Sequence, residues 1–154
     1  MASVTIQITG VDRIVGKLNP SLYRGALTGM LSDLAVIAQT AARDAAPKDT
    51  NAGVRSIMAD VQATQAVIGR GMLNYMRVMD QGRRAGAAMP PPQALVGWMR
   101  RHGMSGSPYA LARSISRRGI KGRFFLRHGY EVTVRALPAA TAKFAREVEA
   151  AWGR

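Results

Sequence analysis

The sequence has 154 residues, of which 47% are hydrophobic and 20% are charged, and this balance predicts one folded domain over residues 1–154. The longest apolar run, Leu34–Ala38, is far shorter than the roughly 18 residues that span a bilayer, and the first residues lack a secretory signal, so no membrane segment is expected. The absence of cysteine excludes disulfides, thiol catalysis and cysteine-ligated metal centres.

Positive charge is the unusual property of this sequence. Lysine and arginine together number 22 against nine acidic residues, for a formal net charge of +13. No acidic residue occurs between Asp80 and Glu131, a stretch that holds ten basic ones. Such a field favours an acidic partner, which can be nucleic acid, an anionic lipid surface or an acidic protein. A solvated basic surface without a partner is the alternative interpretation.

The N-terminal quarter predicts a strand followed by a long helix. Residues 3–8 alternate β-branched and polar side chains, which is typical of a strand, and residues 11–18 have the length of a short helix. Asn19 or Ser21 can cap the long helix, with Pro20 in its first turn, and Pro47 ends it. From Leu22 onward the apolar residues recur every three to four positions, as in an amphipathic helix: Leu22, Ala26, Leu27, Met30, Leu31, Leu34, Ala35, Ile37, Ala38, Ala41 and Ala42.

The next segment predicts a hairpin. Residues 54–61 and 65–68 are two expected strands joined by a turn near Ala63 and Thr64. Residues 72–80 are apolar with three methionines, and their period fits a helix and a strand equally well.

The basic half of the chain predicts two helices between loops. Residues 81–92 form an expected loop that ends in three prolines, and residues 104–108 form another. The helix expected over 92–102 places three side chains inward: Leu95, Trp98 and Met99. The helix over 109–118 places Leu111, Ala112 and Ile115 on one side and Arg113, Arg117 and Arg118 on the other.

The C-terminal region predicts two helices that meet at a proline. A basic turn over 119–123 is followed by an apolar anchor, Phe124–Leu126, from which a helix continues to about residue 137. Pro138 is expected at a junction or first turn. Phe144, Val148 and Trp152 recur every four residues and give the last helix one apolar stripe. The fold class expected from these elements is α+β: a long helix in the N-terminal half packed on a small, mainly antiparallel sheet, with C-terminal helices.

Residues suited to catalysis or to metal binding are scarce. The two histidines, His102 and His128, each sit beside arginines, and no spacing brings them together as a nuclease pair would require. No carboxylates or histidines cluster at ligand spacing, and the glycine-rich turns do not match a phosphate-binding loop. We therefore expect a protein that is not an enzyme and that carries no cofactor and no metal.

The arginine-rich segment is the best candidate site, because guanidinium groups pair with carboxylates and phosphates in a bidentate way. Phe124, Phe125 and Tyr130 follow closely in sequence, so a nucleic-acid surface that combines aromatic and basic side chains is one interpretation. The other places these aromatic residues in the core and the arginines outside. The predicted interface residues are Arg83, Arg84, Arg113, Arg117, Arg118, Lys121 and Arg123.

Several segments taken in order resemble one family. The stretches Ala45–Thr50 and Arg55–Ile57 resemble an A-P-x-D-T-G-x-L-x-x-S-I motif, with Asn51 and Gly53 as departures from it. The later segments that carry the resemblance are Tyr75 to Gly82, Gly82–Gly86, Met89–Pro92 with Leu95 and Trp98, and Ile115 through Gly119 to Phe124–Leu126. Together, over roughly residues 22–150, they are similar to the gene-product-ten-like family of neck and tail-completion proteins of long-tailed bacteriophages.

The resemblance implies a structural virion protein without catalytic residues. Such a protein would form a homo-oligomeric ring in the neck, link the DNA-filled head to the tail, and be assembled in the host cytoplasm. Its implied partners are adjacent neck, tail-terminator or tail-tube proteins, with packaged DNA in the ring lumen as a further candidate and no membrane. The alternatives from the residues alone are a stand-alone basic nucleic-acid-binding accessory protein and, more remotely, a small nuclease.

Overall fold

The computed structural model describes residues 4–7 and 20–152. It contains six helices and five strands in these ranges, so the expected α+β class is confirmed. In chain order they are β1 (Val4–Gln7), α2 (Pro20–Ala45), α3 (Asn51–Arg55), β2 (Ala59–Val61), β3 (Gln65–Ile68), α4 (Asn74–Gln81), β4 (Gly82–Arg83), α5 (Gln93–Arg101), α6 (Pro108–Arg118), β5 (Ile120–Lys121) and α7 (Phe125–Trp152).

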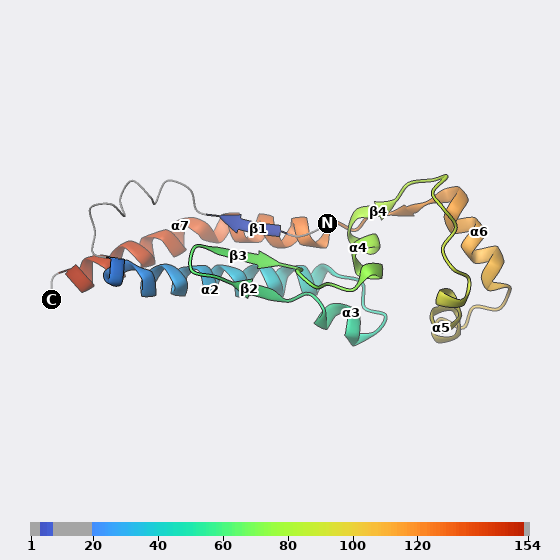
Figure 1. Cartoon of the computed structure of the whole chain (residues 1–154), viewed down its shortest axis with the longest axis horizontal. Coiled ribbons are helices and arrows are strands. Elements are labelled where there is room, and N and C mark those ends of the chain that lie inside the picture. Colours follow the sequence, from blue (N-terminus) through green and yellow to red (C-terminus); the bar gives the residue numbers. More distant parts are fainter. Residues whose placement is uncertain (1–3, 8–19, 153–154) are drawn as a thin grey trace.

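Two long antiparallel helices, α2 and α7, form the main part of the molecule (Figure 1). A three-stranded antiparallel sheet of order β1-β3-β2 lies along them, with β2 and β3 against α2 and β1 against α7. We call these elements, with α3 and α4, the body. The long helix predicted from the apolar spacing is therefore confirmed, and so is the hairpin that pairs Ala59 with Ile68.

The core of the body lies between α2, the sheet and the start of α7. Leu31 and Leu34 of α2 are fully buried, and Phe125 of α7 is buried against the same sheet-facing cluster as Ile57 and Ile68. Further along, Ala136, Ala140 and Phe144 of α7 pack against the leucines of α2. Small residues let the two helices approach closely: a Cβ on Gly129 would lie 2.7 Å from the Ala38 carbonyl oxygen of α2.

A second part of the molecule, residues 84–118, extends beyond α4 at the end opposite the C-terminal end of α7 (Figure 1). We call it the arm; it consists of the loop after β4, α5, α6 and the loop between these helices. The two strands β4 and β5 connect it to the body as an antiparallel pair, which we call the ribbon, with Gly82 opposite Lys121 and Arg83 opposite Ile120. The segments expected to be a plain loop at 81–92 and a basic turn at 119–123 thus contribute the two strands of the ribbon.

Two further expectations need correction, and one open alternative is resolved. Residues 54–58 are not a strand, because Asn51–Arg55 forms α3: Ser56 donates its hydroxyl to the Gly53 carbonyl, and a Cβ on Gly53 would lie 2.8 Å from Met76 Sδ of α4. The ambiguous segment around Met76 is a helix, α4. Trp98, expected to face inward, keeps 37% of its surface exposed.

The proline in the C-terminal region does not divide the helix. Pro138 lies inside α7, on its exposed side, where the carbonyl of Val134 can be solvated after losing the N–H partner that proline lacks. Ala136 and Ala140, on either side of it, are packed against α2, which keeps both halves of α7 against that helix. The expected helix at 11–18, the proposed cap Asn19 and the side chains of Ser21 and Trp152 lie outside what the structure describes. Ser21 is the second residue of α2, which begins at Pro20.

Candidate interaction surface

The arm carries most of the predicted interface residues and has almost no core of its own. Only two of its apolar side chains, Met99 and Ala112, are buried. Five of its large apolar side chains are at least 37% exposed: Met89, Val96, Trp98, Met104 and Tyr109. An isolated monomer gains no stability from exposing five large apolar side chains on a part as small as the arm. Exposed apolar side chains surrounded by charged ones are typical of interaction sites.

One face of α6 brings three of the predicted arginines together. Arg113, Arg117 and Arg118 line a shallow groove of about 300 Å³. The other lining residues are Tyr109, Ala110 and Ser114. These six residues, which we call the α6 groove, follow the helical repeat, so the sequence spacing alone was enough to place the arginines on one side.

The opposite face of α6 holds the helix in the arm. Ala112 is buried and Leu111 and Ile115 are half-buried, as the spacing predicted. Ser116 donates its hydroxyl to the Ala87 carbonyl over 2.7 Å, and the amide of Gly86 donates to the Ser116 carbonyl over 2.8 Å. The loop before α5 is therefore tied to α6, which leaves the α6 groove turned away from it.

The other predicted interface residues lie at or near the ribbon, in different surroundings. Arg84, Lys121 and Arg123 are exposed. Arg83 is half-buried and bends back, because its guanidinium donates to the carbonyl of Ala88 within the arm. Its Nε is buried without a hydrogen-bond partner in the described structure. The structure thus turns Arg83 toward the arm itself, whereas the three arginines of the α6 groove face outward.

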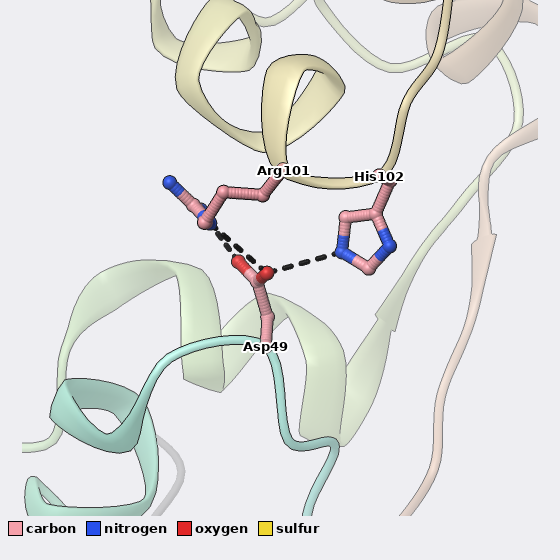
Figure 2. Close-up of polar contacts among 3 residues, drawn as sticks. All are labelled: Asp49, Arg101 and His102. Carbon is pink, nitrogen blue, oxygen red and sulfur yellow. Dashed lines mark hydrogen bonds and ion pairs between the residues drawn. The ribbon is translucent and has the colours of Figure 1, made fainter.

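A carboxylate of the body binds the end of α5 (Figure 2). Asp49, in the loop between α2 and α3, accepts two hydrogen bonds from Arg101, from Nε over 3.1 Å and from a terminal nitrogen over 2.6 Å. His102 Nε2 lies 3.0 Å from the same carboxylate. Trp98 contacts the His102 ring, with the two ring centroids 4.5 Å apart. We call this set of contacts the Asp49 bridge.

The Asp49 bridge joins the arm to the body. Among the described residues, every side-chain hydrogen bond from arm to body runs through Asp49. The hydrogen bonds from Arg101 lower the pKa of Asp49 below its ordinary value of 3.8; partial burial opposes this shift and the contact with His102 adds to it. The carboxylate is therefore ionised at neutral pH. Sequence reasoning did not identify the bridge, because its partners are 52 residues apart.

The ribbon is built from glycines that allow the backbones to approach. Gly119 has a positive φ of 74°, and a Cβ there would lie 2.9 Å from the amide nitrogen of Ala85. Gly82 also has a positive φ, of 80°, and a Cβ would lie 2.6 Å from the Ile120 carbonyl oxygen. Both positions exclude larger residues, so the path of the chain into and out of the arm is fixed by these glycines.

Within the described residues no group of three or more histidines, aspartates or glutamates is placed to hold a metal ion. His102 is engaged with Asp49, while His128 lies exposed in the first turn of α7. No helix in the described ranges is long and apolar enough to cross a membrane.

Comparisons of the chain with protein-family models, with curated proteins and with solved structures found no match.

Proposed function

We propose that this chain is a structural subunit of a bacteriophage neck, a tail-completion or head–tail joining protein that works as a homo-oligomeric ring in the virion. The motif order described above points to this family, and the geometry of the arm supports an assembly role independently of that resemblance.

The observation that carries the proposal is the contrast between body and arm. The body has two clusters of buried apolar residues, both packed against Val61, and they include fully buried side chains such as Leu31, Leu34 and Phe125. The arm extends away from it, buries two apolar side chains and exposes five large ones. An element built in this way gains its packing from another molecule, as subunits of a ring or of stacked rings do.

The role is mechanical, since subunits and rings interlock through such arms and no bond is made or broken. The positive charge of the arm also supports an assembly role. The arm contains arginines and no acidic residue, so it favours acidic neighbours and disfavours pairing with the arm of another copy.

The test is to locate the chain. Purified particles of the phage that encodes it should each contain as many copies of the chain as one ring has subunits. Labelling with a specific antibody should place the chain at the head–tail junction. A chain that is absent from particles and that binds duplex DNA as a monomer or dimer, with an affinity falling steeply as salt is raised, would support the nucleic-acid-binding accessory protein instead.

A further inference from the structure

We infer that the α6 groove is a docking site for an acidic segment of a different protein, one that presents carboxylates from a helix or an extended strand. This inference rests on the proposed function, because it assigns the partner class of the arm. The charge of the arm, the shape of the groove and the distribution of carboxylates in the chain carry it.

The first step is the charge that the arm leaves unpaired. From β4 to the end of β5 the chain has no acidic residue. Among the described residues, none of Arg113, Arg117 and Arg118 forms an ion pair or a side-chain hydrogen bond. Three guanidinium groups on two turns of one helix repel one another, so a ligand that brings negative charge between them relieves that repulsion.

The second step is the way this molecule already satisfies an arginine of the arm. Arg101 receives its carboxylate from outside the arm, from Asp49 of the body, in a two-point contact. Carboxylates match the planar guanidinium in this manner. The α6 groove offers the same guanidinium donors at a place where the body supplies no acid, so a carboxylate that pairs with them comes from another molecule.

The third step is the shape of the groove. Small side chains, Ala110 and Ser114, lie one turn apart, while Tyr109 stands at one end and remains 55% exposed. Small residues flanked by longer ones allow a neighbouring helix or strand to come close, and an exposed tyrosine provides an aromatic surface for its apolar side chains. The phosphate backbone of a duplex, whose bases are already stacked, uses the arginines but gains little from these apolar surfaces, so the groove suits a polypeptide better than a DNA duplex.

The fourth step is the distribution of acidic residues over the described part of this chain, which disfavours a second copy as the source of the acid. The exposed acidic residues without an ion pair in the described structure are dispersed: Asp44 near the end of α2, and Glu131 and Glu149 far apart on α7. Glu131 is also flanked one turn away on each side by Arg127 and Arg135. Asp33 and Glu147 do share one face, but both of their carboxylates lie within ion-pair distance of Lys143. The described carboxylates are therefore dispersed or already paired, which favours a different protein as the partner.

The experiment measures binding of two fluorescent probes to the full chain by anisotropy. One probe is a helical peptide with pairs of glutamates at i and i+4 on an alanine- and leucine-containing background; the other is a 20-base-pair duplex. The test variant is Arg117→Glu with Arg118→Glu. The matched control, Arg135→Glu with Arg146→Glu, makes the same change of net charge on exposed positions of α7.

The inference predicts that the test variant loses at least tenfold in affinity for the acidic peptide while the control variant stays within about threefold of the unmodified chain. Equal losses in the two variants would show that net charge alone attracts the peptide and would overturn the inference. A selective loss of duplex binding in the test variant, with peptide binding unchanged, would replace the protein partner by nucleic acid.

A second readout separates this inference from the proposed function. In particles assembled with the test variant, filled heads and complete tails should accumulate unjoined, although the variant keeps the melting temperature of the unmodified chain. If the chain is found at the head–tail junction and joining is normal with the test variant, the proposed function stands and the docking site is wrong. If the chain is absent from particles, the proposed function fails first.

Discussion

At the scale of single residues, two aspartates connect distant parts of the chain, Asp49 with a lowered pKa and Asp80 with a raised one. Asp80 of α4 is 5% exposed, and its Oδ1 accepts the backbone N–H of Leu126 over 3.0 Å. Asp80 therefore caps the N-terminus of α7 from α4. Phe124, the residue before α7, cannot provide this cap, because its side chain is apolar and its φ of 51° is left-handed. The guanidinium of Arg127 lies over the Phe124 ring, 5.0 Å from its centroid.

The pH dependence of stability should reveal the buried Asp80. Burial raises the pKa of Asp80 above its ordinary value of 3.8, and the backbone N–H groups of Leu126 and Phe125 oppose this shift. Because the folded-state pKa of Asp80 is raised, the contribution of Asp80 to folding stability is fully present below pH about 3.8 and is lost as pH rises through that pKa. Asp80→Asn removes this loss and keeps an oxygen acceptor. The melting temperature of the variant minus that of the unmodified chain should therefore increase as pH rises from 3.8 toward neutrality.

Asp80→Ala serves as the comparison, because it removes the acceptor altogether. It should cost about 0.5–2 kcal/mol of stability, the usual cost of a lost helix cap, at both ends of the pH range. A flat difference between Asp80→Asn and the unmodified chain across pH would show that the carboxylate is not desolvated in solution.

Leu34 tests the core that the apolar spacing predicted. Its side chain is fully buried in α2, beside Leu31 and against α7. Leu34→Ala should lower the free energy of unfolding by roughly 2–5 kcal/mol, because a buried cavity remains. Val36→Ala is a matched control on the same helix, since Val36 is 60% exposed, and it should change stability by under about 0.5 kcal/mol. Chemical denaturation measures both, and equal effects would place the core elsewhere.

At the scale of elements, the ribbon determines how the arm leaves the body. Gly119→Ala brings a methyl group against the carbonyl oxygen of Arg83 and the amide of Ala85, in addition to the strain of a positive φ. Gly86→Ala supplies the matched control: its φ is +78°, but nothing lies within 4 Å of the added Cβ. We expect Gly86→Ala to cost about 1 kcal/mol and Gly119→Ala clearly more. Similar losses in denaturant melts would mean that the two strands of the ribbon do not pack as closely as described.

The Asp49 bridge is expected to hold the orientation of the arm. The lowered pKa of Asp49 means that its contribution is present above about 3.8 and is lost as pH falls through the folded-state pKa. Spin labels on the exposed residues Val36 and Tyr109 would report the distance between body and arm by pulsed electron resonance. Asp49→Asn should broaden that distance distribution, whereas Asp60→Asn, which removes the exposed pair with Arg70, should leave it unchanged. A distribution that stays narrow after Asp49→Asn would mean that the ribbon alone fixes the arm.

Sequence patterns predicted the elements whose formation depends on local periodicity. They did not predict the structure where contacts between residues distant in sequence determine it. The spacing in α2 and α6 was sufficient, because each helix buries one regular face. Of the strand expected at 54–61, only Ala59–Val61 is a strand, whereas Val54 and Arg55 belong to α3, where Gly53 fits against α4. Pro138 stayed inside α7, because α2 packs against both halves of that helix. The ribbon and the Asp49 bridge join residues far apart in sequence, so no local pattern could indicate them.

The same limit applies to the candidate site. The arginines of the α6 groove were predicted as a group because they share one helix face. Arg83 was included on charge alone, and only the fold shows that it is directed toward Ala88. The exposed apolar residues of the arm also needed the structure, because the expected inward position of Trp98 assumed that α5 lay against a full core.

At the scale of the whole molecule, the body is built to be stable alone and the arm to make contacts. A chain in which residues 84–118 are replaced by a short glycine–serine turn keeps β4, β5 and the whole core. It should remain folded, with the helical circular dichroism expected for the body and a cooperative thermal transition. Loss of the transition would show that the arm contributes to the core of the body.

The most direct measurement of the central claim uses this shortened chain in phage assembly. Particles produced with it, in a background that lacks the full chain, are examined by negative-stain electron microscopy and titred for infectivity. We expect filled heads and complete tails that remain separate, with infectivity reduced by orders of magnitude and restored by the full chain. Normally joined, infectious particles made with the folded, shortened chain would contradict the claim that the arm makes the contacts on which joining depends.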